Sequence, residues 1–147
     1  RMNKTTWGVV GAIEVIAAIA VVAIATIMGG CDHTLETTSG GTCFMKCHWT
    51  FIAVSIFGVA GIASSVLALF GKTAEGRRFA AIGVIVVAAL AIFATLDEGI
   101  GLCGTTAMHC HQTALGVRIA SVAAAICAIV QLIKADPNAV NIPKMKL

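Results

Sequence analysis

Apolar residues gather along this chain into four long runs separated by short polar segments. The runs cover residues 7–28, 49–70, 79–96 and 113–133. A helix of about 20 residues crosses a ~30 Å hydrocarbon core, and each run is close to that length. The pattern therefore predicts four transmembrane helices. Because the connections are short, we expect an up-down-up-down antiparallel bundle.

The composition also indicates that these helices are surrounded by lipid and not by water. The 147 residues are 59% hydrophobic and only 12% charged, against about 25% charged residues in soluble domains. The remaining polar residues are too few to cover four such helices in water. We predict an all-α integral membrane protein in which residues 1–147 form one transmembrane domain. The scattered basic residues do not predict binding to nucleic acid, and no phosphate-binding glycine motif is present.

Basic residues predict the orientation in the membrane. The loop at 29–48 has a single basic residue, Lys46, and the loop at 97–112 has none. Apart from Arg118 inside the fourth run, the other basic residues cluster before the first run, in the middle loop at 71–78, and after the fourth run: Arg1, Lys4, Lys72, Arg77, Arg78, Lys134, Lys144 and Lys146. By the positive-inside rule, both termini and the tail at 134–147 are cytoplasmic, and the two loops 29–48 and 97–112 face outward.

A short motif, Met-x-Cys-His-x-Thr, occurs twice, each time at the outer start of a run. Its two copies are Met45, Cys47, His48 and Thr50, and Met108, Cys110, His111 and Thr113. This placement predicts two helical hairpins related by a pseudo-two-fold axis, with the motifs facing each other at the outer mouth. Thr50 and Thr113 stand where helix N-caps are expected, and a helix N-terminus beside a cysteine favours its thiolate.

Cysteines outside the cytoplasm usually pair in oxidising compartments. Five are predicted to be there: Cys31, Cys43, Cys47, Cys103 and Cys110. Two disulfides would leave one thiol over, and the connectivity stays open among Cys31–Cys43, Cys43–Cys47, Cys103–Cys110 and Cys47–Cys110. Such disulfides would staple an outer cap. Cys127, inside the fourth run, is predicted to be a packing residue.

Two active-site hypotheses compete with the disulfide cap. Methionine, cysteine and histidine suit Cu(I) first and Zn(II) second. The candidate ligands are Met45, Cys47, His48, Met108, Cys110 and His111. The second hypothesis is thiol-disulfide exchange, although Cys43/Cys47 and Cys103/Cys110 are spaced more widely than the usual C-x-x-C pair.

Two charged residues interrupt the apolar runs. Glu14 lies about two turns into the first run, and Arg118 lies below the outer end of the fourth. Their different depths argue against a direct pair. Arg118 is expected to reach outward or to pair with Asp97 or Glu98. An intramembrane carboxyl such as Glu14 is a candidate functional group, a neutral acid, or a contact to a partner subunit.

The motifs resemble those of a family of uncharacterised small bacterial four-span membrane proteins. The resemblance rests on Cys43, Met45, Cys47 to Thr50, Cys103 and the Met108–His111 segment, within residues 7–133. Members are often found alongside ABC-transporter permeases. The resemblance implies an accessory subunit of an exporter in the bacterial cytoplasmic membrane, with no activity that could be carried over. We therefore predict a non-enzymatic protein that binds lipid and larger membrane subunits; self-association also stays open.

Overall fold

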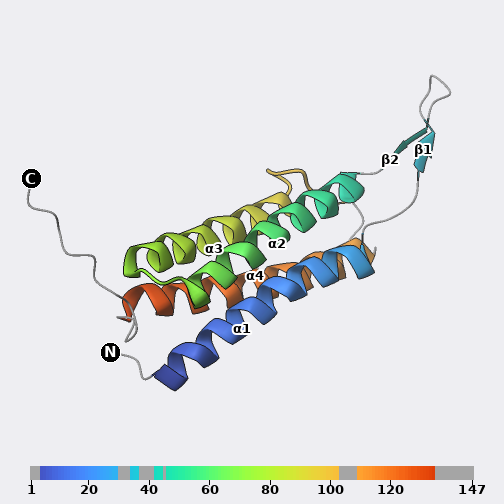
Figure 1. The fold of residues 1–147 in the computed structure, drawn as a ribbon. Coiled ribbons are helices and arrows are strands. Elements are labelled where there is room, and N and C mark those ends of the chain that lie inside the picture. Colours follow the sequence, from blue (N-terminus) through green and yellow to red (C-terminus); the bar gives the residue numbers. More distant parts are fainter. Residues whose placement is uncertain (1–3, 30–33, 37–41, 45, 103–108, 135–147) are drawn as a thin grey trace, which may run out of the picture.

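The computed structural model of the chain describes residues 4–29, 34–36, 42–44, 46–102 and 109–134. Its helices are α1 (Lys4–Ala23), continued by the π-helix η1 (Ile24–Met28), then α2 (Lys46–Phe70), α3 (Ala74–Ala94) and α4 (His109–Ile133). They form one antiparallel bundle (Figure 1). Four segments are long and apolar enough to cross a membrane. The predicted all-α four-helix membrane bundle is confirmed.

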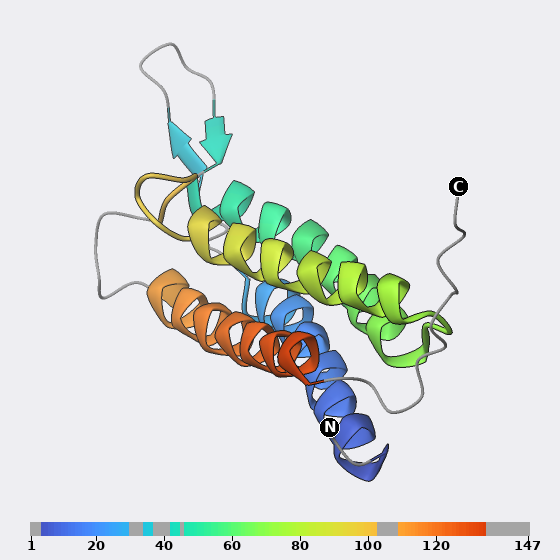
Figure 2. The same cartoon turned by 90° about the vertical axis from the view of Figure 1, so that its left-hand side faces the viewer.

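The four helices stand at the corners of a square. α1 packs against α2 and α4, and α3 packs against the same two neighbours. α1 is therefore diagonal to α3, and α2 is diagonal to α4 (Figures 1 and 2). The starts of α2 and α4 lie at one end of the bundle, which we call the motif end. The start of α1 and the connection between α2 and α3 lie at the other end.

The connection between α2 and α3 is shorter than the expected 71–78 loop, because α3 begins at Ala74. Thr73 is its N-cap, and the Thr73 Oγ1 accepts a hydrogen bond of 3.2 Å from the Gly76 N–H. Glu75 in the first turn complements the positive end of the helix dipole. Local capping therefore adds a polar turn to the third apolar run and lengthens it into a full span.

A short antiparallel ribbon, which we did not predict, precedes α2. Strand β1 (Thr34–Glu36) pairs with β2 (Thr42–Phe44), with Leu35 opposite Cys43. Each strand contains one threonine, and β2 also contains Phe44, and both residue types favour extended backbone. The ribbon lies beyond the helices at the motif end (Figure 1). It places the backbone of Cys43 just before the first copy of the motif.

The buried positions of α4 repeat those of α2 at a constant separation. The matched pairs are Cys47 and Cys110, Thr50 and Thr113, Phe51 and Ala114, Val54 and Val117, Gly58 and Ser121, Gly61 and Ala124, Ser65 and Ala128, and Ala68 and Gln131. α1 and α3 match in the same way: Gly11 and Ala81, Glu14 and Val84, Ala18 and Ala88, Val21 and Ala91, and Ala25 and Thr95. This correspondence supports the expected pseudo-two-fold axis.

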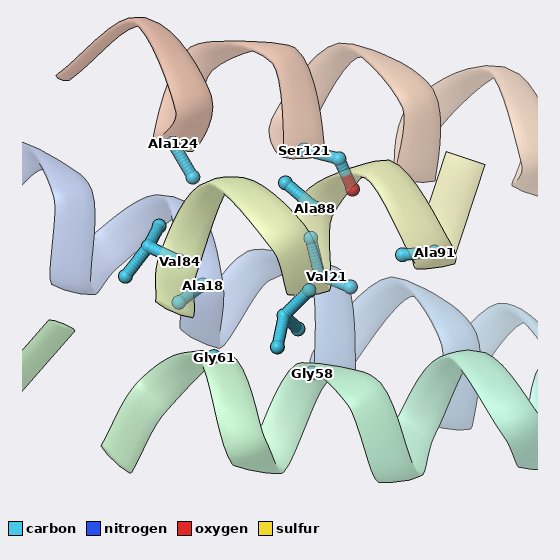
Figure 3. A pocket seen from close by; sticks show the side chains of 10 residues that line it. Ala18, Val21, Gly58, Gly61, Val84, Ala88, Ala91, Ser121 and Ala124 are labelled. Atoms are coloured by element: carbon cyan, nitrogen blue, oxygen red, sulfur yellow. The ribbon is translucent and has the colours of Figure 1, made fainter. Parts of the chain in front are cut away.

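Small side chains let the four helices approach each other at the centre of the bundle. Gly58 and Gly61 of α2 lie against Val21 and Ala18 of α1, while Ser121 of α4 lies beside Ala88 of α3 (Figure 3). The space that remains is a cavity of about 20 Å³, room for about one water molecule. The middle of the bundle is therefore packed.

Candidate functional site

The two motif cysteines are brought together at the motif end. Cys47 lies in the first turn of α2 and Cys110 in the first turn of α4, and both side chains are completely buried. Both belong to one apolar cluster with Val54, Val117 and Ala94. The diagonal helices thus direct the two equivalent thiols into the same buried layer, as the repeated motif suggested.

Thr50 and Thr113 are not N-caps, and that expectation is wrong. α2 begins at Lys46 and α4 at His109, so both threonines lie in the second turn and are buried. Each hydroxyl lies 3.2 Å from the carbonyl oxygen four residues earlier. The Thr50 hydroxyl also donates a shorter bond, 2.6 Å, to the Gly101 carbonyl oxygen. Both helices start before the predicted N-caps, since the Cys-His segment of each motif already forms the first helical turn.

The motif histidines do not share the buried layer of the cysteines. His48 and His111 are half-buried, and His109 is exposed. The His48 ring meets the exposed Trp49 edge-to-face, with centroids 5.7 Å apart. Within the described ranges, no group of three or more His, Cys, Asp or Glu side chains could hold a metal ion. Met45 and Met108 lie outside the described residues, so the metal set stays a prediction.

The disulfide map also stays a prediction. Cys31 and Cys103 lie outside the described residues, and Cys43 is described only as backbone in β2. Of the described cysteines, Cys110 and Cys127 carry free thiols in this structure. Cys127 is half-buried in α4, in keeping with a packing role.

The burial of Cys110 predicts slow alkylation. In the folded, detergent-solubilised protein, a local opening free energy of about 3 kcal/mol would slow its reaction with a maleimide by about 100-fold relative to the unfolded chain. Peptide-resolved mass spectrometry over time measures the rate. The matched control is Gln112→Cys, an exposed position on the same helical turn. Equal rates at Cys110 and at the control would contradict the buried placement.

Glu14 is hydrogen-bonded to Gln131 across the α1–α4 interface. The Gln131 Nε2 donates to the Glu14 Oε2 at 2.6 Å, and both side chains are buried. Ser65 of α2 adjoins the same carboxyl. We had not singled out Gln131 or Ser65 in the sequence. The signal was available for Gln131, since an amide near the end of an apolar run needs a partner.

Arg118 binds the C-terminal end of α3. Its Nε donates to the Thr95 Oγ1 at 2.8 Å and its Nη2 to the Thr95 carbonyl oxygen at 2.7 Å. Thr95 is the C-cap of α3, so the guanidinium satisfies a carbonyl that the helix leaves open and complements the negative end of its dipole. This partner replaces the expected pairing with Asp97 or Glu98.

An open groove of about 460 Å³ lies between η1 and the half of α2 nearer the motif end. It includes Ala25 and Ser55, the two-fold equivalents of Thr95 and Arg118. In the second hairpin, Arg118 of α4 spans the equivalent position and contacts Thr95 at the end of α3. The serine is too short to do the same, so the first hairpin keeps a groove. Other lining residues are Thr26, Ile27, Met28, Gly29, His48, Phe51, Ile52 and Ile56.

Comparison with known proteins identifies one family. The family described as "Domain of unknown function (DUF4418)" matches residues 13–134. No curated protein and no solved structure matches the chain. The matched segment begins before Glu14 and ends just after α4, so it includes both motif copies, the groove and the two buried polar contacts.

Proposed function

The chain belongs to the DUF4418 family, and from that premise we propose that it is a non-enzymatic accessory subunit of an ABC-type exporter in the bacterial cytoplasmic membrane. The observation that supports this role is the close packing along the axis of the bundle. Residues from all four helices, chiefly glycine and alanine, leave a central cavity of only about 20 Å³ (Figure 3). Such an interior suits a rigid bundle whose surfaces bind a partner.

The groove between η1 and α2 is the contact surface that best fits this role. It has apolar walls from Phe51 and Ile52, and polar groups at Thr26, His48 and Ser55. In the second hairpin a side chain of this protein, Arg118, occupies the equivalent position. We propose that a side chain from a helix of the larger permease subunit enters the groove of the first hairpin.

Exposed small residues on α1 offer a second surface. Gly8 and Ala12 are one turn apart and both exposed, and a Cβ added at Gly8 would have no atom within 4 Å. In membranes, a pair of small residues at this spacing lets another helix approach closely. This surface supports close packing against a partner helix.

Affinity purification in a mild detergent tests the proposal. We expect ABC permease subunits to co-purify with the tagged chain from its native membrane. Ser55→Trp, which fills the groove, should lower their recovery about tenfold or more, the effect of 1.4 kcal/mol. The matched control is Ala89→Trp on the exposed face of α3, which should leave recovery unchanged. Recovery of the chain only as an isolated monomer would overturn the proposal.

A second candidate function is Cu(I) or Zn(II) binding, or thiol-disulfide exchange, at the two motif copies. The burial of Cys47 and Cys110 in one cluster favours it, since two thiols in one layer are the start of a ligand set or a redox pair. Metal analysis of the purified protein together with a thiol count under non-reducing conditions tests this candidate. Metal bound in a stoichiometric amount, or a disulfide that responds to reductant, would support it over the accessory role alone.

A further inference from the structure

Three polar side chains from three helices meet inside the bundle, near the end where α1 begins. They are Glu14 of α1, Ser65 of α2 and Gln131 of α4, with exposed fractions of 0%, 1% and 5%. The Gln131 amide donates to one carboxyl oxygen of Glu14, and Ser65 adjoins the same carboxyl. Gln131 lies two residues before the end of α4. The cluster is therefore buried but close to the bundle end that we expect to be cytoplasmic.

Two oxygens of the cluster, the Glu14 Oε1 and the Gln131 Oε1, are buried without a hydrogen-bond partner among the described residues. The Ser65 Oγ makes no hydrogen bond of ordinary geometry, but it lies close enough to the Glu14 carboxyl to act on it as a hydrogen-bond donor. Leaving a buried polar atom unsatisfied costs about 1–3 kcal/mol. Both the Glu14 Oε1 and the Gln131 Oε1 accept hydrogen bonds or coordinate a cation, and the single Ser65 hydroxyl can donate to only one of them. At least one oxygen of the set therefore lacks a donor or a cation.

The groups that contact the Glu14 carboxyl, the Gln131 amide and the Ser65 hydroxyl, carry no positive charge. Lys134, one turn beyond Gln131 and just past the end of α4, is exposed. From α3, the Arg77 guanidinium lies over the Trp7 ring, 5.9 Å from its centroid, and its Nε donates to the Gly71 carbonyl. Trp7 is about two helical turns from Glu14, or ~10 Å along α1. From α4, Cys127 lies within electrostatic range of Glu14, and a thiol supplies no positive charge. A buried, uncompensated carboxylate is very costly, so Glu14 is stable here only when it holds a proton or another cation.

The second half of the bundle shows that the fold does not need this polar cluster. The two-fold equivalents of Glu14, Ser65 and Gln131 are Val84, Ala128 and Ala68, all buried. Apolar residues pack the equivalent interface at the same depth. Replacing a buried charged contact with apolar residues is often neutral or stabilising. The polar cluster is present in only one half of the bundle although packing does not require it. This asymmetry points to a binding role.

We infer that Glu14, Ser65 and Gln131 form a binding site for a monovalent cation, either a proton or Na⁺, held by three oxygens. Oxygen atoms are the ligands that hard cations prefer. A proton on Glu14 would neutralise the carboxyl and allow it to donate to a neighbouring oxygen. A sodium ion would contact all three. The site lies outside both motif copies and the groove, so the inference is independent of the proposed partner.

The probe for this site is dicyclohexylcarbodiimide, an apolar reagent that reacts with protonated carboxyls in membrane proteins. The wild-type protein is treated in detergent over a range of pH and of Na⁺ concentration, with choline chloride holding the ionic strength constant. Mass spectrometry measures labelling at Glu14. We expect labelling to fall about tenfold per pH unit above its midpoint as the proton is lost. If Na⁺ also binds, it protects Glu14 at constant pH.

The outcomes separate the two cations from the absence of a site. A pH response whose midpoint shifts in Ser65→Ala or Gln131→Leu assigns the proton, and additional protection by Na⁺ assigns sodium. A pH response that both variants leave unchanged, without protection by Na⁺, would overturn the inference. Labelling that is insensitive to both, or no labelling at any pH unless the protein is unfolded, would overturn the inference. Ser65→Ala and Gln131→Leu keep the carboxyl but remove one oxygen each, so they should change the pH or Na⁺ dependence. Ser121→Ala, buried and likewise unpartnered but in the central cavity, should leave both dependences unchanged.

Discussion

Gly58→Leu is expected to destabilise the bundle by about 3 kcal/mol, the upper part of the range for overpacking a close-packed interior. A Cβ at Gly58 would lie 2.5 Å from the Val22 Cγ2 and 3.4 Å from the Val21 Cγ1. Valine has one strongly preferred rotamer in a helix, so neither side chain can turn away. α1 must shift away from α2, which opens the packed centre of the bundle.

Thermal unfolding in detergent, followed by circular dichroism, measures this effect. The matched control is Gly8→Leu, because a Cβ at Gly8 meets no atom within 4 Å. Both variants lose the same glycine and gain the same side chain, so helix propensity cancels between them. We expect the control to stay within about 0.5 kcal/mol of wild type. If the two variants unfolded alike, close packing of α1 on Gly58 would not be what stabilises the bundle.

Arg118→Leu is expected to cost about 2 kcal/mol. It removes both hydrogen bonds to Thr95 and leaves the buried C-cap carbonyl without this donor, while the Thr95 hydroxyl keeps its 2.7 Å bond to the Ile92 carbonyl oxygen. Hydrogen bonds to charged groups contribute about 1.5–3 kcal/mol in soluble proteins. Measured polar contacts between membrane helices are weaker, ~0.6 kcal/mol on average. The estimate lies between these values because two bonds are lost together.

A double-mutant cycle with Thr95→Val tests whether the loss comes from this contact. In the Thr95→Val background, Arg118→Leu should cost less, because one of the two acceptors is already gone. Arg118→Lys should restore only part of the stability, since an ammonium cannot reproduce the guanidinium fork. Arg78→Leu, exposed near the start of α3, is the control for loss of charge. Full additivity in the cycle would show that the bond to the Thr95 hydroxyl contributes nothing to the loss.

The sequence by itself determined the number of helices, their lengths and the repeat. The bilayer imposes a length on each apolar run, so four runs predict four spans without knowledge of their contacts. The two Met-x-Cys-His-x-Thr motifs also predicted the internal symmetry. The structure matches α2 to α4 position by position, from Cys47 and Cys110 at the motif end onward. These features depend on hydrophobicity and local spacing, which can be read along one chain.

Only the tertiary structure decided the partners of the buried polar residues. The pairings of Glu14 with Gln131 and of Arg118 with Thr95 depend on how far each helix is rotated and shifted against its neighbours. This rotation and shift are set by close contacts at small residues, such as Gly58 against Val22. The polar residues themselves do not indicate them in the sequence. The helix starts were misjudged for a related reason. A threonine caps a helix only where the backbone leaves the helical conformation, and at Thr50 and Thr113 the helix has already begun.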